Sequence, residues 1–344
     1  MKNLLFIILL IILVSLASTQ INAIYLSNVN ASISRAINFL YENQLDYGEF
    51  KTLACEDKLM QNCYFDSSPF VTTFVLYSMK GMKDKKIEIM KDKALNFLLN
   101  EQEQGGIWRY WISKNTGKIS PIPPDLDVIS TVSFILKINN RSFDNNLKLI
   151  SKNKNNDNLF FTWVTDAENK ETICCLMNKT FKNDADCVVN ANVLLYLGQN
   201  DQRICSYINN AIKFNESCSK YYPNRLVLYY AVSRAFENNV TCFEEVKNVI
   251  VKSTLNYQNK DGSFGNALDT ALALNTLFNF KYYGNEVNLG INNLLQSQSP
   301  NGSWTKSIFY LGPPPYYGSG SEELTTALVI EVLKKYLEIR TSSG

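Results

Sequence analysis

Two kinds of helical pattern alternate along the chain. Six segments are apolar on most sides, and each follows a segment whose apolar residues recur on one face only. The apolar segments are 69–79, 125–136, 185–197, 225–236, 267–277 and 323–333. The one-faced segments lie near 29–43, 86–101, 143–152, 201–213, 243–257 and 286–297. Because a helix that is apolar all round must be covered on most sides, the pattern predicts six inner and six outer helices.

This alternation predicts an all-α fold, an (α/α)6 toroid of six helical hairpins in two concentric layers. Six pairs are enough to close a ring, although an open solenoid of helical hairpins has the same pattern. The chain has 344 residues, 46% of them hydrophobic, and no low-complexity segment, which fits a single domain with a large core. We expect this domain to cover residues 24–340 and to end in a frayed tail.

A short repeat marks the ends of several outer helices. It reads Gln-x3-Gly-x-aromatic and starts at Gln44, Gln102, Gln258 and Gln298. Three of the four repeats follow an amphipathic helical pattern, so we expect Gln to close each helix and Gly to supply the turn beyond it.

The first residues of the chain have the pattern of a secretory signal. A lysine precedes an apolar run at 4–14, and Ser15 and Ala17 offer a cleavage site, with Ala23 as the alternative. An uncleaved membrane anchor is the other interpretation, but polar residues interrupt the apolar run before it reaches spanning length. We expect a signal peptide at 1–23, no transmembrane span after cleavage, and a secreted or secretory-lumen protein.

Sequons and cysteines agree with that route. Six Asn-x-Ser/Thr sequons could carry glycan, at Asn30, Asn140, Asn178, Asn215, Asn239 and Asn301. The eight cysteines are an even number, which fits an oxidising compartment. Cys55 and Cys63 lie close together in one predicted loop and are the expected disulfide. The other six cysteines could pair in fifteen ways, and the sequence does not choose among them.

Charge and composition exclude several functions. The net charge is +2 and no basic block exists, so nothing indicates nucleic-acid binding. The chain contains no histidine. It therefore lacks the usual general base at neutral pH, the commonest zinc ligand, and any Ser-His or Cys-His nucleophile. Any chemistry must use carboxylates, cysteines, tyrosines or a bound cofactor.

The Gln-x3-Gly-x-aromatic repeat resembles the QW motif of squalene-hopene and oxidosqualene cyclases. The helix alternation is similar to their α/α toroid and to the β-subunits of protein prenyltransferases. This resemblance to the terpene cyclase and prenyltransferase toroids covers almost the whole mature chain. It implies that the repeat is structural, with Gln bonding to neighbouring backbone and the aromatic ring packing between outer helices.

The resemblance also implies a candidate acid. These cyclases protonate an isoprenoid double bond or epoxide with the middle Asp of an Asp-x-Asp-Asp motif. Here Asp125-Leu126-Asp127-Val128 looks like that motif with Val in place of the last Asp. Asp127 then matches the proton donor and Asp125 its companion. An Asp before an apolar helix is also an ordinary N-cap, but Asp127 lies inside the first turn, where a cap cannot sit.

Further candidates gather at one mouth of the expected ring. Parallel inner helices would bring their N-termini together there, and helix dipoles favour anions. Carboxylates at that mouth could protonate an alkene, hold a divalent cation or cap helices, so no cofactor is required and a cation stays open. The segment 311–320 is a candidate lid. The candidate substrate-binding residues are Trp108, Trp111, Asp186, Asp269, Glu323, Tyr316 and Tyr317.

Two functions remain open. The first is a secreted terpene-cyclase-like enzyme, of the isomerase or lyase class, that protonates and cyclises an isoprenoid or other polyene. The second is a non-catalytic secreted toroid that binds a lipid or a protein partner. Cyclases of this type usually bury the polyene between two helical domains. An enzyme with one such domain would therefore need a second domain, a partner protein or a smaller substrate. An open apolar cavity beside Asp127 would favour the enzyme, and a plugged ring centre the binding protein.

Three other toroid families are less compatible with the sequence. A protein prenyltransferase needs a zinc site that includes His. A complement-type thioester domain needs a Gly-Cys-Gly-Glu-Gln stretch, which does not occur. A cobalamin-carrier-like toroid shares the ring, the signal peptide and the glycosylation, but the repeat does not point to it.

Overall fold

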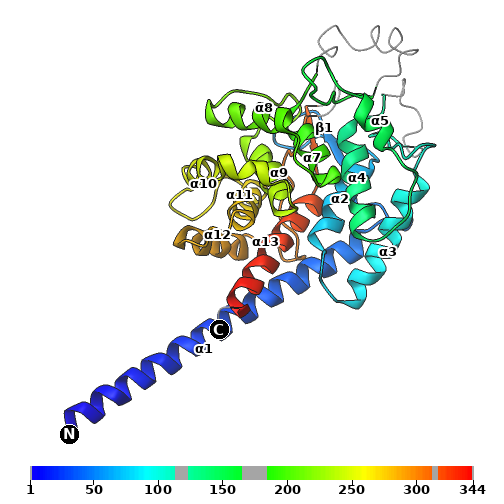
Figure 1. Ribbon diagram of the computed structural model, residues 1–344. Helices are drawn as coiled ribbons and strands as arrows, with labels where there is room; N and C mark the ends of the chain where they lie inside the picture. The colour runs from blue at the N-terminus through cyan, green and yellow to red at the C-terminus, as the bar shows by residue number, and fades with distance from the viewer. Residues whose placement is uncertain (1, 113–122, 165–183, 312–316, 343–344) are drawn as a thin grey trace.

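The computed structural model describes residues 2–112, 123–164, 184–311 and 317–342, with side chains described from residue 23 on. The inner helices are α2 (Pro69–Ser78), α4 (Leu126–Ile138), α7 (Cys187–Leu197), α9 (Arg225–Glu237), α11 (Ala267–Asn279) and α13 (Glu322–Ser342) (Figure 1). The outer helices are α1 (Lys2–Asn43), α3 (Lys85–Asn100), α5 (Leu147–Lys152), α8 (Gln202–Lys213), α10 (Lys247–Leu255) and α12 (Asn285–Gln296). A 3-10 helix, η2 (Thr241–Val246), leads into α10.

The inner helices form a closed ring. Each contacts the next in chain order, from α2 through α4, α7, α9 and α11 to α13, and α13 returns to contact α2. This last contact excludes the open solenoid and confirms the predicted all-α toroid. The predicted inner and outer segments match the observed helices to within a few residues at most ends.

Burial explains the two sequence patterns. All ten residues of α2 are buried, because neighbouring helices cover it on every side. The outer helix α3 buries six of its sixteen residues, all of them apolar, and leaves its charged face in water. Apolar area buried on one face is enough to hold an outer helix against the ring.

Helix α1 is much longer than the predicted outer helix. Its C-terminal part packs on the ring through fully buried Val29, Ala36 and Leu40, while its N-terminal part extends away from the ring (Figure 1). Within the described ranges, no helix combines the length and the apolar character that a bilayer span requires.

The repeat joins successive outer helices. In the first repeat, the Gln44 side-chain nitrogen donates to the Gly48 carbonyl at 3.0 Å and to the Met90 carbonyl of α3 at 2.9 Å. Gln258 donates in the same way to Gly262 and to Glu286 of α12. One amide therefore closes its own turn and holds the next outer helix.

The fourth repeat closes the outer layer. Gln298 donates to its own Gly302 carbonyl and to the Ser32 carbonyl of α1, both at 3.0 Å. Gly302 has φ +91, and a Cβ there would lie 2.4 Å from the Arg35 carbonyl oxygen. Only glycine allows the turn and α1 to approach so closely.

The aromatic residue of the repeat is a packing residue. Trp108 and Trp304 are fully buried, and their indole N–H groups donate to the Leu98 and Leu294 carbonyls at 2.7 and 2.8 Å. Each ring therefore fills the wedge beneath the end of its own outer helix. The resemblance implied packing between successive outer helices, and these hydrogen bonds instead join each indole to its own outer helix.

A small sheet lies beside the inner ring. Its strands are β1 (Leu53–Cys55), β2 (Cys63–Phe65) and β3 (Gly318–Gly320), antiparallel in the order β2-β1-β3. The cysteines expected in a loop thus lie on paired strands, where Cys55 and Cys63 are directly opposite and bonded. Two further disulfides join Cys187 to Cys218 and Cys205 to Cys242. Cys174 and Cys175 lie outside the described residues.

Replacing Gly302 tests how the ring closes. Gly302→Ala adds a Cβ against the Arg35 carbonyl, which must displace α1 or the turn. We expect it to lower the free energy of unfolding by roughly 1–3 kcal/mol beyond the cost of its positive φ. Urea unfolding followed by circular dichroism measures the change.

Gly198 is the matched control. It has φ +67 at the end of α7, and nothing lies within 4 Å of a Cβ built there. Gly198→Ala should therefore cost only the backbone strain, about 1 kcal/mol. Equal losses for the two variants would show that the contact with α1 does not matter.

Candidate active site at the ring mouth

The N-termini of the inner helices lie together at one mouth of the ring. Hydrogen bonds join several of them there: the Tyr222 hydroxyl, just before α9, donates to Asp127 of α4, two helices away in the ring, and Asn224 donates to Asp269 of the adjacent α11 at 2.6 Å. Polar side chains cap all six helices. These caps are Ser68, Asp125, Asp186, Asn224, Asn266 and, for α13, Ser321.

Asp125 is the N-cap of α4. Its carboxylate accepts a 2.7 Å bond from the Val128 backbone N–H, and burial raises its pKa to about 8. The backbone bond acts in the opposite direction but does not outweigh burial. Asp125 therefore has the capping geometry that the sequence left open beside the catalytic interpretation.

Asp127 is not a cap. Its Oδ1 accepts a 2.6 Å bond from the Asn192 side-chain amide of α7, and its Oδ2 accepts from the Tyr222 hydroxyl. Burial raises its pKa to about 6, although both of these bonds lower it. A carboxyl that titrates near pH 6 can hold a proton and release it under mildly acidic conditions.

The loop that carries Tyr222 is fixed from several sides. Cys218 is bonded to Cys187, the first residue of α7. Asp186 Oδ2 accepts from the Ser219 hydroxyl at 2.6 Å and from the Lys220 N–H at 2.8 Å. Asp186 is thus occupied in holding this loop and capping α7, and the loop in turn sets the position of Tyr222 against Asp127.

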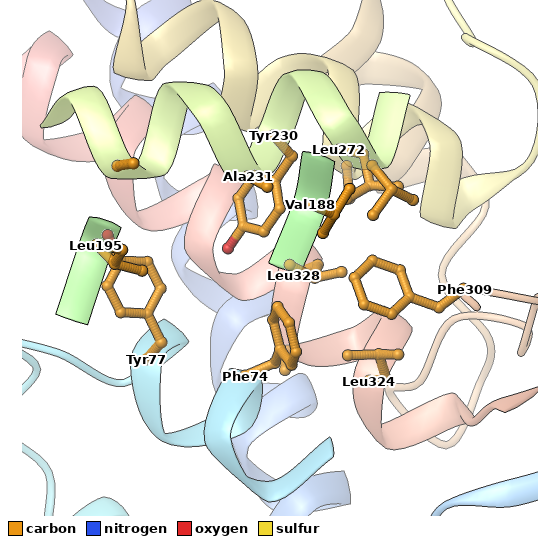
Figure 2. Packing of buried hydrophobic residues seen from close by; sticks show 14 of the residues in the cluster. Phe74, Tyr77, Val188, Leu195, Tyr230, Ala231, Leu272, Phe309, Leu324 and Leu328 are labelled. Atoms are coloured by element: carbon orange, nitrogen blue, oxygen red, sulfur yellow. The ribbon is translucent and has the colours of Figure 1, made fainter. Parts of the chain in front are cut away.

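Aromatic rings occupy the space beside Tyr222 and Asp127. The Tyr222 ring lies 5.9 Å from that of Phe309 and 6.2 Å from that of Tyr310, measured between centroids. Phe309 also meets Phe74 of α2 at 5.1 Å in an edge-to-face contact. Figure 2 shows Phe309 among Phe74, Leu324 and Leu328 in the core. Side chains of the protein therefore fill this part of the ring.

Asp66, just before α2, belongs to the same mouth. It is buried, and its Oδ2 accepts from the Tyr110 hydroxyl at 3.0 Å and from the Trp111 indole at 3.3 Å. The Tyr110 and Tyr310 hydroxyls are 2.9 Å apart. Trp111, a predicted substrate-binding residue, is thus half-buried at the mouth.

The other predicted substrate-binding residues have varied positions. Trp108 lies in the outer-helix wedge described above, and this geometry is that of a structural repeat residue rather than of a ring-lining one. Asp269 is bonded to Asn224, and Glu323 is buried in the first turn of α13, where burial raises its pKa. The Tyr317 ring is 38% exposed beneath the Lys58 ammonium.

The predicted lid is only partly described. Tyr316 lies outside the described residues, as do residues 312–315. Gly318–Gly320 form strand β3 against β1, so this end of the segment is part of the sheet. In the described ranges, no group of three or more Cys, Asp or Glu side chains is arranged to hold a metal ion.

Sequence reasoning missed Asn192, Tyr222 and Asp66. Asn192 had a usable signal, because an amide in an otherwise apolar, fully covered helix needs a buried hydrogen-bond partner. Tyr222 and Asp66 lie in connections between helices, where nothing in the periodicity indicates which way a side chain points.

Solved structures share this fold. A variant of the type II terpene cyclase MstE from Scytonema, in complex with its substrate geranylgeranyl dihydroxybenzoate, superposes with a TM-score of 0.71 at 15% identity, over 91% of this chain and 99% of that one. A protein from Actinoplanes gives 0.71 at 16% identity, over 89% and 99%. The ent-copalyl diphosphate synthase from Streptomyces platensis gives 0.50 at 15% identity, over 78% and 50%.

The protein therefore has an α/α toroid fold similar to that of the type II terpene cyclase MstE. No family model matches the chain, and no curated protein matches its sequence. At 14–16% identity, the likeness to MstE and to the Actinoplanes protein concerns the fold.

Asp125 makes stability depend on pH. Its folded pKa of about 8 exceeds its unfolded value, so its contribution to stability is full below about pH 4 and is lost as pH rises through 8. Asp125→Asn keeps the capping oxygen but binds no proton. As pH rises over that range, we expect the free energy of unfolding of the variant, relative to that of the wild type, to increase by up to about 1.4 kcal/mol per pH unit. Urea unfolding at a series of pH values measures this difference.

Asp201 provides a control of opposite sign. It caps the outer helix α8, and although burial raises its pKa, the Lys154 ammonium and backbone N–H groups bring it below the usual value. Its contribution is therefore already complete above about pH 4. The difference between Asp201→Asn and wild type should stay constant from there to pH 8. A constant difference for Asp125→Asn as well would show that its pKa is not raised.

Proposed function

We propose that this protein is a terpene-cyclase-like enzyme that protonates and cyclises an isoprenoid, with Asp127 as the proton donor. The single observation that carries the proposal is the placement of Asp127. Its carboxyl group lies inside the first turn of an inner helix, makes no cap, and is held by donors from two other parts of the ring.

The proposed first step transfers the Asp127 proton to an alkene carbon. The π electrons form the new C–H bond and leave a carbocation on the neighbouring carbon. A second double bond attacks that cation and closes a ring. Water then takes a proton from the cyclised cation, which gives the neutral product, and a proton from solvent restores the Asp127 carboxyl group. The Asn192 amide and the Tyr222 hydroxyl stabilise the Asp127 carboxylate that remains.

Two sequence features support the proposal. The Gln-x3-Gly-x-aromatic repeats resemble those of squalene-hopene cyclases, and Asp125 and Asp127 match the first two acids of the cyclase motif. A fold of this extent fits the proposal, because the matched region covers 98–99% of the chain of MstE, a type II terpene cyclase.

Two observations favour a second candidate, a non-catalytic toroid that binds a lipid or a protein. Val128 replaces the last acid of the motif, and Phe309 and Tyr310 fill the space next to Tyr222. For an isoprenoid to reach Asp127, these rings must move aside. A panel of isoprenoids incubated with purified protein, followed by mass spectrometry of extracted products, distinguishes the two.

We also propose that the protein is secreted and glycosylated after cleavage near Ala23. Three disulfides are compatible with an oxidising compartment. Every sequon asparagine in the described ranges is exposed, and Asn178 lies outside them. The exposed ones are Asn30, Asn140, Asn215, Asn239 and Asn301.

Asp127→Asn tests the proton donor. The amide keeps the shape and can still bond to its neighbours, but it has no transferable proton. We expect turnover to fall by about three orders of magnitude or more while the unfolding midpoint changes little. Product formation from an isoprenoid panel and thermal unfolding measure the two effects.

Asp125→Asn is the matched control at the cap. Because Asp125 is the companion and not the donor, this variant should retain measurable turnover. Undiminished cyclisation by the Asp127→Asn protein would end the proposed mechanism, and no cyclisation by wild type would favour the binding protein.

Non-reducing mass spectrometry of protein from its native source tests the compartment. We expect the three bridges Cys55–Cys63, Cys187–Cys218 and Cys205–Cys242, glycan on at least one exposed sequon, and a new N-terminus after the signal. Eight free thiols would contradict secretion.

A further inference from the structure

Arg234 is a buried cation that the proposed proton transfer does not explain. It lies on α9 near the ring centre with 3% of its surface exposed. Among the described residues it forms no ion pair within 4.0 Å, and its Nε has no hydrogen-bond partner. A buried charge without a paired carboxylate is costly, so its retention needs a reason.

Three aromatic rings, those of Phe74, Tyr77 and Tyr230, surround the guanidinium and form an aromatic cage. Its central carbon lies 4.8 Å from the ring centroid of Phe74, 5.4 Å from that of Tyr77 and 5.2 Å from that of Tyr230. Figure 2 shows these three rings in the core of the toroid. Such contacts attract the guanidinium electrostatically to the aromatic faces.

The two tyrosines are themselves bonded to carboxylates. The Tyr230 hydroxyl donates to Glu331 at 2.8 Å, and the Tyr77 hydroxyl donates to Glu237 at 3.2 Å. Lys335 pairs with both of these glutamates. Glu331 and Glu237 therefore already have a cationic partner, and the phenol rings separate them from Arg234.

The hydrogen-bonded neighbour of Arg234 leads to Asp127. Arg234 Nη2 donates to Asn192 Oδ1 at 2.8 Å, and Asn192 Nδ2 donates to Asp127 Oδ1 at 2.6 Å. The cation polarises the amide, which makes its N–H a stronger donor to the carboxylate. In this relay of Arg234, Asn192 and Asp127, the positive charge stabilises the Asp127 carboxylate without a direct ion pair.

We propose that Arg234 acts through Asn192 as the counter-ion of Asp127 and stabilises the carboxylate that remains after Asp127 has given up its proton. This inference rests on the proposed function for its catalytic meaning. Arg234 is a positioning residue, because it reaches the reacting carboxyl only through the amide. It makes Asp127 a stronger acid than burial alone would allow.

Other charged and titratable groups face this relay from every neighbouring element. Asp125 lies on α4 with Asp127, Asp186 caps α7, and Tyr222 and Tyr310 approach from connecting segments. Below Arg234 are Tyr77 of α2, Tyr230 and Glu237 of α9, and Glu331 and Lys335 of α13. A test must therefore isolate the effect of Arg234 on Asp127 from these groups.

The same geometry removes three rings from another role. Aromatic faces of inner helices could in principle stabilise a carbocation, but those of Phe74, Tyr77 and Tyr230 already surround Arg234. A second cation placed among them would be repelled by the guanidinium. The reacting carbons therefore have to stay on the Asp127 side of the cage.

The experiment follows the protonation of Asp127 in the full protein without substrate. Infrared difference spectra over a pH series give the midpoint of its carboxyl band, which is identified by its loss in Asp127→Asn. Arg234→Met keeps an unbranched side chain in the cage and removes the charge. We expect it to raise the midpoint by about one pH unit, and to lower kcat at least tenfold if the wild type turns over an isoprenoid.

Three further variants make the outcome decisive. Arg225, on the same helix, bonds to the carbonyls of Glu216 and Ala211, so Arg225→Met should leave the midpoint unchanged. In an Asn192→Leu background the effect of Arg234→Met should shrink, because the relay is already broken. If Arg234→Met does not fold, Arg234→Gln, which keeps a bond to Asn192, is expected to raise the midpoint in the same way.

An unchanged midpoint in a folded Arg234 variant would overturn the counter-ion role, whether or not the enzyme is active. A raised midpoint in a protein that turns over no isoprenoid would support the relay and count against the proposed function. The two proposals can therefore fail separately.

Discussion

Closure of the inner ring is the constraint on which the rest of this structure depends. An inner helix such as α2 is apolar on all sides, so it is stable only when neighbours cover every side. In an open array the first and last inner helices would expose such faces to water. The contact of α13 with α2 removes both exposed faces at once, and Gln298 makes the same closure in the outer layer by bonding to α1.

Closure also determines the electrostatics of the mouth. It brings Asp66, Asp125, Asp127 and Asp186 together in a buried region, and burial is the largest cause of the raised pKa of the last three. Capping uses some of these groups, because helix N-termini need acceptors. Asp127 differs from them, since its oxygens accept bonds from side chains of other elements and none from the backbone of its own helix.

The ring interior next to Asp127 contains several charged side chains that compensate one another. Arg234 lies in its aromatic cage, and beneath it the carboxylates of Glu331 and Glu237 are paired with Lys335. The charge of Arg234 is thus compensated by aromatic rings, and the charges of Glu331 and Glu237 are compensated by Lys335. Packed aromatic side chains therefore lie on one side of Asp127 and a charged protein interior on the other.

The sequence by itself determined the helix pattern, because the apolar periodicity of each segment depends on whether one side or all sides of the helix are buried. It also indicated the repeat turns, the Cys55–Cys63 pair, and Asp127 as the acid that could not be a cap. Tertiary structure alone decided what each side chain meets: Tyr222, Asn192 and Arg234 are 95, 65 and 107 positions from Asp127 along the chain. Contacts over such separations depend on ring closure and on loop paths fixed by Cys187–Cys218 and Asp186, and neither leaves a local pattern in the sequence.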